Sequence, residues 1–361
     1  MDLNNLVLFF VLIGFSLFFY KYFLPILKKL NPKLLVDDQL GKPQAFHEFP
    51  TSTAGGTFIF ISLLIVNFNF FLFKNIIFLE YLLFCILFFL LGFADDVKIK
   101  IKPLIRLFLM IVFLAVLVKY NDFYLKYTGI EVLNNWLEGS KIFSLIFICL
   151  CFLFVINGAN LIDGYNGLLG FHSLIILINL FAVNYLSGNS DLANLLFFQI
   201  IILIIFLIFN FPKAKIFLGD GGSYFLGTFI AVSVIQTSIE NPTISPFYFC
   251  ILLFYLFFEV FFSFFRKLIK EKMSPIHPDR KHLHMLFYKI LLKKNNEKLK
   301  SNYRVSIFIN LIYLVLIIPA ILMMKNGLFC KYYSIVFFVI YLFLYKIASM
   351  KINNKISGDF S

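Results

Sequence analysis

The sequence predicts an all-α polytopic membrane protein. Its 361 residues are 61% hydrophobic and only 14% charged, and 52 of them are phenylalanine. Soluble domains are usually about 45–50% apolar and about 25% charged. Apolar runs of about 18 or more residues recur along the whole chain, and each could cross the hydrocarbon core as a helix. We therefore expect residues 1–361 to form one integral-membrane domain with no separate soluble domain.

About eleven membrane-spanning helices are expected. They lie near residues 3–27, 54–73, 76–93, 104–120, 141–157, 168–187, 192–209, 223–240, 246–265, 305–324 and 332–350. The first run lacks the basic leader and the small-residue cleavage site of a signal peptide, so we expect it to be a retained helix.

Lysine and arginine are distributed unevenly among the connections. Most of the 32 lie after odd-numbered spans, and the largest group falls in residues 266–304. Because positively charged connections remain in the cytoplasm, this pattern predicts an outside N-terminus and a cytoplasmic C-terminus. The net charge of +13 then indicates contact with the anionic lipid bilayer and no nucleic-acid partner.

Five polar clusters fall on that same predicted cytoplasmic side. They are Gln44–Gly56, Asp95–Arg106, Asn157–Gly167, Asn210–Ser223 and Ser274–His284. A pore would need polar residues through the depth of its spans. Polar groups gathered at one face instead favour a single composite active site at the membrane surface.

Two adjacent aspartates, Asp95 and Asp96, end the third span. Such a pair can bind a divalent cation or deprotonate an acidic substrate. The alternative is a solvated helix end that pairs with Lys98 or Lys100.

The segment Asn157–Gly167 reads NGANLIDGYNG and combines Asp163 with the amides of Asn160 and Asn166. Ionisable and polar side chains at the end of a membrane segment usually mark a site. Glycine and asparagine are also common in turns, so a plain interhelical turn remains the alternative.

The segment Asn210–Ser223 places Asp220 among three glycines just before an expected helix, with Lys213 and Lys215 nearby. A helix N-terminus suits a diphosphate, and an unpaired aspartate suits the Mg²⁺ that would neutralise it. The alternative is that Asp220 is a helix N-cap.

The segment from Ser274 to Met285 holds three of the chain's five histidines, His277, His282 and His284, together with Arg280. Anion binding by these groups is favoured over zinc binding, because no further thiol or carboxylate ligand lies at a convincing spacing. Within the spans, Glu259 is expected to form a structural ion pair with Arg266, and His172 of the sixth span is expected to be a satisfied core histidine.

Taken in this order, the five clusters resemble the polyprenyl-phosphate N-acetylhexosamine-1-phosphate transferase family over about residues 40–290. The resemblance implies transfer of a sugar-1-phosphate from a UDP-N-acetylhexosamine to undecaprenyl phosphate, with release of UMP. It also implies a Mg²⁺ cofactor, with Mn²⁺ as an alternative, and a multi-pass location in the bacterial inner (plasma) membrane.

The resemblance implies a role for each matched residue. Asp95 and Asp96 match the catalytic aspartate pair credited with activating the lipid phosphate, while Asp220 and Asn160 match the metal site. The implied substrate contacts are Asp163, Asn166, Asn210, Phe217, Arg280, His282 and His284. In the family, the first four lie near the uridine end and the last three in the loop over the sugar phosphate.

The chain departs from the family pattern at several positions. Ser52 and Thr53 replace a proline and an arginine, Asn166 replaces a second aspartate, and Glu259 replaces an aspartate. Met285 stands in place of the last histidine of the family's His-x-His-His run, and the chain lacks the three consecutive histidines typical of the peptidoglycan translocase. We therefore favour a transferase that initiates a surface polysaccharide such as O-antigen.

Two other functions stay open on sequence grounds. One is a polytopic transporter of lipid-linked sugars, which would need charged residues deep in its spans. The other is a non-catalytic family member. A homodimer is also open.

Overall fold

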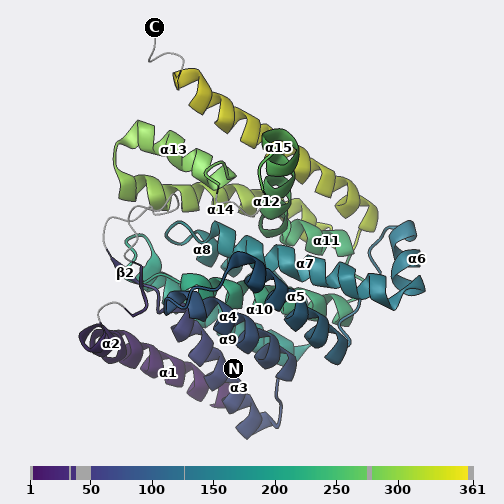
Figure 1. Ribbon diagram of the computed structural model, residues 1–361. Helices are drawn as coiled ribbons and strands as arrows, with labels where there is room; N and C mark the ends of the chain where they lie inside the picture. Colours follow the sequence, from purple (N-terminus) through teal and green to yellow (C-terminus); the bar gives the residue numbers. More distant parts are fainter. Residues whose placement is uncertain (1–2, 32–33, 38–49, 126, 275–278, 357–361) are drawn as a thin grey trace.

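The computed structural model describes residues 3–31, 34–37, 50–125, 127–274 and 279–356, and the chain is predominantly helical there (Figure 1). The elements are α1 (Leu3–Phe18), α2 (Leu24–Leu30), β1 (Val36–Asp37), β2 (Thr51–Ser52), α3 (Gly55–Lys74), α4 (Leu79–Asp96), α5 (Pro103–Tyr120), α6 (Glu131–Gly139), α7 (Lys141–Ile162), α8 (Leu168–Leu186), α9 (Ser190–Asn210), α10 (Gly219–Glu240), α11 (Pro246–Leu252), α12 (Phe254–Phe265), α13 (Leu283–Asn295), α14 (Lys298–Leu322) and α15 (Gly327–Ile356). π-Helical turns follow α1 at Phe19–Phe23 and α12 at Arg266–Glu271.

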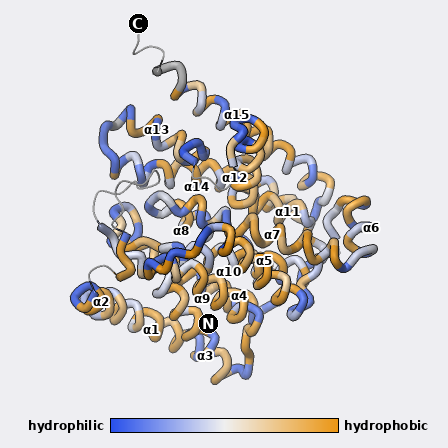
Figure 2. The backbone as a smooth tube through the Cα atoms, in the orientation of Figure 1, coloured by the Kyte–Doolittle hydropathy of each residue, from blue (hydrophilic) through white to orange (hydrophobic). Residues whose placement is uncertain are grey.

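An all-α membrane protein is confirmed. Nine helices of the described chain are long and apolar enough to cross a membrane, or ten if α11 and α12 together form one span. The remaining expected span corresponds to α4, which has 18 residues but carries Glu80, Asp95 and Asp96. The count of eleven and the orientation of the termini therefore stay predictions. Figure 2 shows hydrophobic residues along the helices and hydrophilic residues concentrated in the connections.

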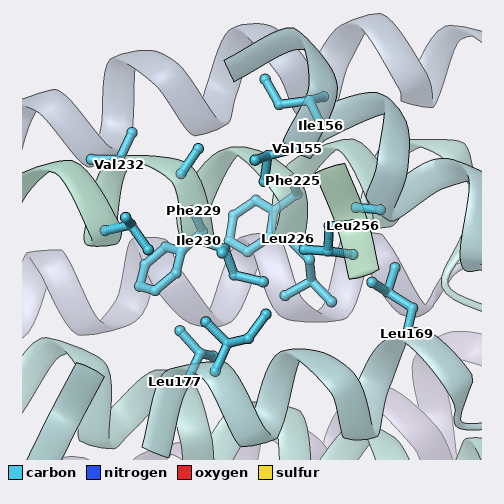
Figure 3. Packing of buried hydrophobic residues seen from close by; sticks show 14 of the residues in the cluster. Val155, Ile156, Leu169, Leu177, Phe225, Leu226, Phe229, Ile230, Val232 and Leu256 are labelled. Atoms are coloured by element: carbon cyan, nitrogen blue, oxygen red, sulfur yellow. The ribbon is translucent and has the colours of Figure 1, made fainter. Parts of the chain in front are cut away.

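The centre of the bundle is α10, which packs against α3, α4, α7 and α8. Its side chains are buried on every side, as is typical of a helix with no polar face. Phe225 and Phe229 project among residues such as Ile156 of α7 and Leu177 of α8 (Figure 3). The polar residues of α10 are therefore found mainly at its ends.

Two glycines bring other helix ends onto the start of α10. A Cβ atom on Gly92 of α4 would collide with the backbone carbonyl of Asp220, and one on Gly56 of α3 with the backbone of Gly222. Only glycine permits so close a backbone approach. As a result, the C-terminal end of α4, with its two aspartates, lies directly against the first turn of α10.

A small sheet ties the first polar connection to the same place. Strand β1 pairs antiparallel with β2, with Val36 opposite Ser52, and Ser52 also bridges to Ile216 in parallel. The backbone N–H of Phe217 donates to the carbonyl of Ser52 at 2.7 Å. The connection before α3 is thereby held beside the segment that leads into α10.

Three expected boundaries are corrected. The span expected to end at residue 157 continues as α7 to Ile162, so Asn160 lies on a helix. The span expected from residue 223 begins at Gly219, which puts Asp220 inside the first turn of α10. The single span expected at 246–265 is two helices, α11 and α12, bent by 74°. At this bend the Tyr313 hydroxyl donates to the carbonyl of Leu252, which satisfies a backbone group freed by the break.

Candidate active site

A cavity of about 680 Å³ lies at the end of the bundle where α4, α7 and α9 end and α5, α10 and α14 begin. Its polar and aromatic lining comprises Asp37, Thr53, Asp95, Asp96, Lys98, Lys100, Arg106, Asn160, Asp163, Tyr165, Asn166, Asn210, Phe217, Asp220 and Asn302. Eight of the eleven site residues expected from the sequence therefore line one cavity.

The lining is acidic. Five carboxylates, those of Asp37, Asp95, Asp96, Asp163 and Asp220, face three cationic side chains, those of Lys98, Lys100 and Arg106. When all five carboxylates are ionised they exceed the cations by two charges, which opposes the entry of an anionic diphosphate, and one divalent cation would cancel that excess. This charge excess is the main chemical property of the site.

Arg106 lies between two of the aspartates. It forms an ion pair with Asp95, approaches the carboxylate of Asp220 to 4.0 Å, and donates to the Tyr224 hydroxyl at 3.2 Å. The sequence reasoning did not single out Arg106 as a site residue. The signal was available, because Arg106 is a lone cation in the first turns of an otherwise apolar helix.

Asp96 has different hydrogen-bond partners from Asp95. Its Oδ1 accepts a hydrogen bond from the backbone N–H of Asp220 at 3.0 Å, and its Oδ2 accepts one from Gly221 at 2.8 Å. Asp96 therefore caps the exposed amides at the start of α10, where a negative charge is favourable.

Asp220 is held by α7 as well as by α4. The amide nitrogen of Asn160 donates to Asp220 Oδ1 at 3.0 Å and to the Ser223 hydroxyl at 2.9 Å. In the described chain the amide oxygen of Asn160 accepts no hydrogen bond, so this oxygen and the Asp220 carboxylate are available as hard oxygen ligands.

Asp163, just after α7, has no hydrogen bond or ion pair to any described residue, although it lines the cavity. Its withdrawal from solvent, followed by the charges of Asp220 and Asp96, raises its pKa well above the usual aspartate range. A cation placed among these carboxylates would reverse that effect.

Asn166 and Asn210 hold the loops of the site together. The Asn166 amide donates to the carbonyl of Pro212 at 2.9 Å, and Asn210 Oδ1 accepts from the Gly167 backbone N–H at 2.7 Å. Asn210 also donates to the carbonyl of Ile216 at 2.9 Å. Both asparagines therefore fix the backbone beside the half-buried ring of Phe217, which reaches the cavity.

The model of the glycosyl transferase family 4 matches residues 78–238 of the chain. A phospho-N-acetylmuramoyl-pentapeptide-transferase of Dictyoglomus turgidum is 33% identical over 76% of this chain and 88% of its own length. The chain belongs to glycosyl transferase family 4. It is thus a member of a family of polyprenyl-phosphate sugar-phosphate transferases.

Relatives in the family differ in their named sugar. An undecaprenyl-phosphate alpha-N-acetylglucosaminyl 1-phosphate transferase of Thermotoga maritima is 30% identical over 64% of this chain and 66% of its own length. The enzyme of the same name from Escherichia coli (strain K12) is 26% identical over 53% of this chain and 52% of its own length. The sugar is consequently not decided by family membership.

Members of the family are expected to use Mg²⁺, so the fit of these residues to that ion matters. In the described part of the chain no three carboxylate, imidazole or thiol groups form a ready metal cage. Mg²⁺ is usually bound by one or two carboxylates together with waters and substrate phosphates. Asp220, the oxygen of Asn160 and the charge excess of the cavity fit that mode, and Mn²⁺ takes similar ligands.

The described residues of the last loop of the family pattern do not line this cavity. Among its described residues, His282 and His284 are buried and Arg280 is exposed, and none of the three lines the cavity. His277 falls outside the described residues. Lys213 and Lys215 are exposed and also absent from the lining.

Two structural expectations for charged groups have clear outcomes. The pair expected between Glu259 and Arg266 is wrong, because Glu259 contacts His282 while Arg266 pairs with Glu271 and Asp279. The expected core position of His172 is confirmed, since its ring is fully buried and its Nδ1 lies 3.2 Å from Asn310 Oδ1, but its Nε2 has no hydrogen-bond partner in the described chain.

The departures from the family pattern lie in different environments. Ser52 is buried in β2 and Met285 is buried in the core, so neither is placed to contact a substrate. Thr53 lines the cavity, and its buried hydroxyl has no hydrogen-bond partner in the described chain. Of the substituted positions, Thr53 and Asn166 are therefore the ones at the cavity.

Proposed function

We propose that this chain transfers N-acetylhexosamine-1-phosphate from a UDP-sugar to undecaprenyl phosphate and releases UMP. The observation that carries the proposal is the cavity in which five carboxylates and three cations surround one space. Such a lining suits two phosphorylated substrates that are joined through a divalent cation. Membership of family 4 supports the reaction class.

The proposed step is a phosphoryl transfer. An oxygen of the lipid phosphate forms a bond to the phosphorus that carries the sugar, and the bond from that phosphorus to the bridging oxygen breaks. UMP leaves with the bonding electron pair. A phosphate monoester has a second pKa of about 6, so the lipid phosphate needs little deprotonation near neutral pH. Positioning and charge stabilisation are then the main tasks of the protein.

Different residues of the cavity perform these tasks. We assign Asp220 and Asn160 to the metal ion, which when bound neutralises charge on the diphosphate. Lys98, Lys100 and Arg106 supply the cationic donors of the cavity. Because both oxygens of Asp96 accept backbone hydrogen bonds from α10, we assign the contact with the lipid phosphate to Asp95 together with its ion-pair partner Arg106.

The proposal also covers where the UDP-sugar binds in the cavity and where the protein lies in the cell. We place Asp163, Asn166, Asn210 and Phe217 around the nucleotide, on the side of the cavity formed by the turn after α7 and the segment before α10. The lysine and arginine distribution supports a cytoplasmic active site in a bacterial plasma membrane. The product would then begin a surface polysaccharide or another envelope glycan.

The test is UMP release by purified, detergent-solubilised protein with undecaprenyl phosphate and either Mg²⁺ or EDTA. The donor panel contains UDP-N-acetylglucosamine, other UDP-N-acetylhexosamines and UDP-N-acetylmuramoyl-pentapeptide. We expect metal-dependent release with one of these donors. Binding of a UDP-sugar without any product would support a non-catalytic member, and movement of a lipid-linked sugar across vesicles without UMP would support a transporter.

A further inference from the structure

Three of the buried ionisable side chains outside the cavity contact one another or share partners. Glu259, His282 and His284 are exposed by only 1%, 2% and 0%. Buried carboxylates and imidazoles are costly unless they are paired, so their partners indicate what they do.

Glu259 connects three helices. Its Oε1 accepts from His282 Nδ1 at 3.1 Å and from the backbone N–H of Leu283 at 3.0 Å, and its Oε2 accepts from the Tyr341 hydroxyl at 2.7 Å. Leu283 is the first residue of α13, and Tyr341 belongs to α15. A carboxylate of α12 therefore caps α13 from outside that helix and holds α15 to the same point.

The residues just before α13 are also held by polar contacts. Asp279 forms an ion pair with Arg266 and accepts from the backbone N–H of Lys281 at 2.9 Å. The second ring nitrogen of His282 lies 3.9 Å from Asp279. Nδ1 of this histidine is therefore engaged by Glu259, while Nε2 faces the Asp279 carboxylate beyond hydrogen-bond distance.

His284 connects this group of contacts to the wall of the cavity. Its Nδ1 lies 3.1 Å from the Tyr255 hydroxyl, and its ring packs edge-on against Tyr165 with 5.7 Å between centroids. Tyr165 lines the cavity. Asn302 of α14, which packs against α13, accepts a hydrogen bond from the Asn166 backbone N–H at 2.8 Å.

We propose that His282 and His284 are positioning residues that fasten the α13–α14 hairpin to the turn at residues 163–167, and that neither contacts substrate. The turn carries Asp163 and Asn166, so its position sets the geometry of the nucleotide side of the cavity. This inference rests on the proposed function only for its kinetic consequence, since the contacts themselves exist without substrate.

The test compares His282→Ala with His282→Asn, because an asparagine amide nitrogen can occupy the place of Nδ1 and donate to Glu259. The first readout is hydrogen–deuterium exchange of the substrate-free protein. We expect faster exchange over residues 163–168 and 283–288 in His282→Ala, and near wild-type exchange in His282→Asn. Lys293→Ala, at an exposed position of α13, is the matched control with unchanged exchange.

The second readout is steady-state UMP release. For His282→Ala we expect a KM for the UDP-sugar raised about fivefold or more and a kcat within about twofold of wild type, with recovery in His282→Asn. If His282→Ala does not fold, Tyr341→Phe removes one donor to Glu259 and serves as the milder variant.

The outcomes separate the two proposals. Unchanged exchange at residues 163–168 in His282→Ala, or an equal loss of kcat in both His282 variants, would overturn the positioning role. Absence of UMP release from the wild-type protein would overturn the proposed function, while the exchange measurement would still decide whether the histidines hold the turn.

Discussion

The carboxylate of Asp96, the last residue of α4, accepts a hydrogen bond from the backbone N–H of Asp220 at 3.0 Å. Its other oxygen accepts from Gly221, so one side chain caps the first turn of α10 across 124 positions in sequence. Two aspartates of the site are therefore coupled through the backbone. The position of Asp96 therefore sets the position of this turn and, with it, that of the Asp220 carboxylate.

The substitution Asp96→Asn tests this coupling. An asparagine has one oxygen, so its NH₂ group would face one of the two backbone N–H groups. We expect the free energy of unfolding to fall by about 1–3 kcal/mol. Because Asp220 would then be less well placed, we expect about a tenfold higher Mg²⁺ concentration for half-maximal UMP release, as is typical when support for a metal ligand is lost.

Thermal unfolding and a Mg²⁺ titration of UMP release measure these two effects. Asp96→Ala, which removes both acceptors, should be worse in both measurements. A lower kcat with an unchanged Mg²⁺ midpoint would instead show that Asp96 acts on the lipid phosphate directly.

Asp220→Asn should remove most activity without unfolding the protein. The amide lacks the negative charge that the Asp220 carboxylate offers to a cation, although it fits the same space beside Asn160. We expect UMP release to fall by about a hundredfold or more. The matched control is Glu240→Gln at the exposed opposite end of α10, which should leave UMP release unchanged. A wild-type rate in Asp220→Asn would remove this residue from the metal site.

Arg106→Lys tests the cation between Asp95 and Asp220. A lysine keeps the charge but loses the planar fork that reaches Asp95 and the Tyr224 hydroxyl together. We expect kcat/KM to fall about tenfold, which is roughly the loss of one charge-assisted hydrogen bond. Tyr224→Phe removes only the hydroxyl and should have a smaller effect. If Arg106→Lys and wild type have equal kcat/KM values, charge alone suffices at this position.

The sequence predicted the helices well and the partners of site residues poorly, for a physical reason. Hydropathy marks which segments enter the membrane, so every expected span falls on helical residues, although the span at 246–265 is the broken pair α11 and α12, and Asp95 and Asp96 were expected at a helix end. Contacts such as that between Asp96 and Asp220 depend on the close approach of α4 to α10 at Gly92. The residues next to either aspartate in the sequence do not indicate that α4 and α10 come so close.

The histidines before α13 are a second case in which the sequence did not show the partners of polar residues. The histidines and the arginine of residues 274–285 predict an anion-binding loop. In the structure His282 and His284 are buried, because Glu259 in the middle of an apolar helix provides the partner. Both Glu259 and His282 were noted in the sequence, but nothing in it indicates that these two residues, 23 positions apart, contact each other.

The stability of the protein should depend on pH through Asp163. Burial, and then the nearby carboxylates Asp220 and Asp96, raise the pKa of Asp163 in the folded state. In the unfolded chain its pKa returns to about 3.9. Between these two values the folded state binds more protons than the unfolded state, so the stability falls as the pH rises from about 4 toward the raised pKa.

Asp163→Asn removes this titration, and a cation among the carboxylates should offset it. In EDTA we expect the Tm of Asp163→Asn to exceed that of wild type at pH 7, and the difference to vanish near pH 4. Adding Mg²⁺ at pH 7 should raise the wild-type Tm more than that of the variant, since the ion stabilises the charged carboxylate only in wild type. Thermal unfolding from pH 4 to 8, with EDTA or Mg²⁺, measures both effects. Parallel Tm profiles of the two proteins would mean that Asp163 is not held at a raised pKa, and that the carboxylates of the cavity do not act on one another.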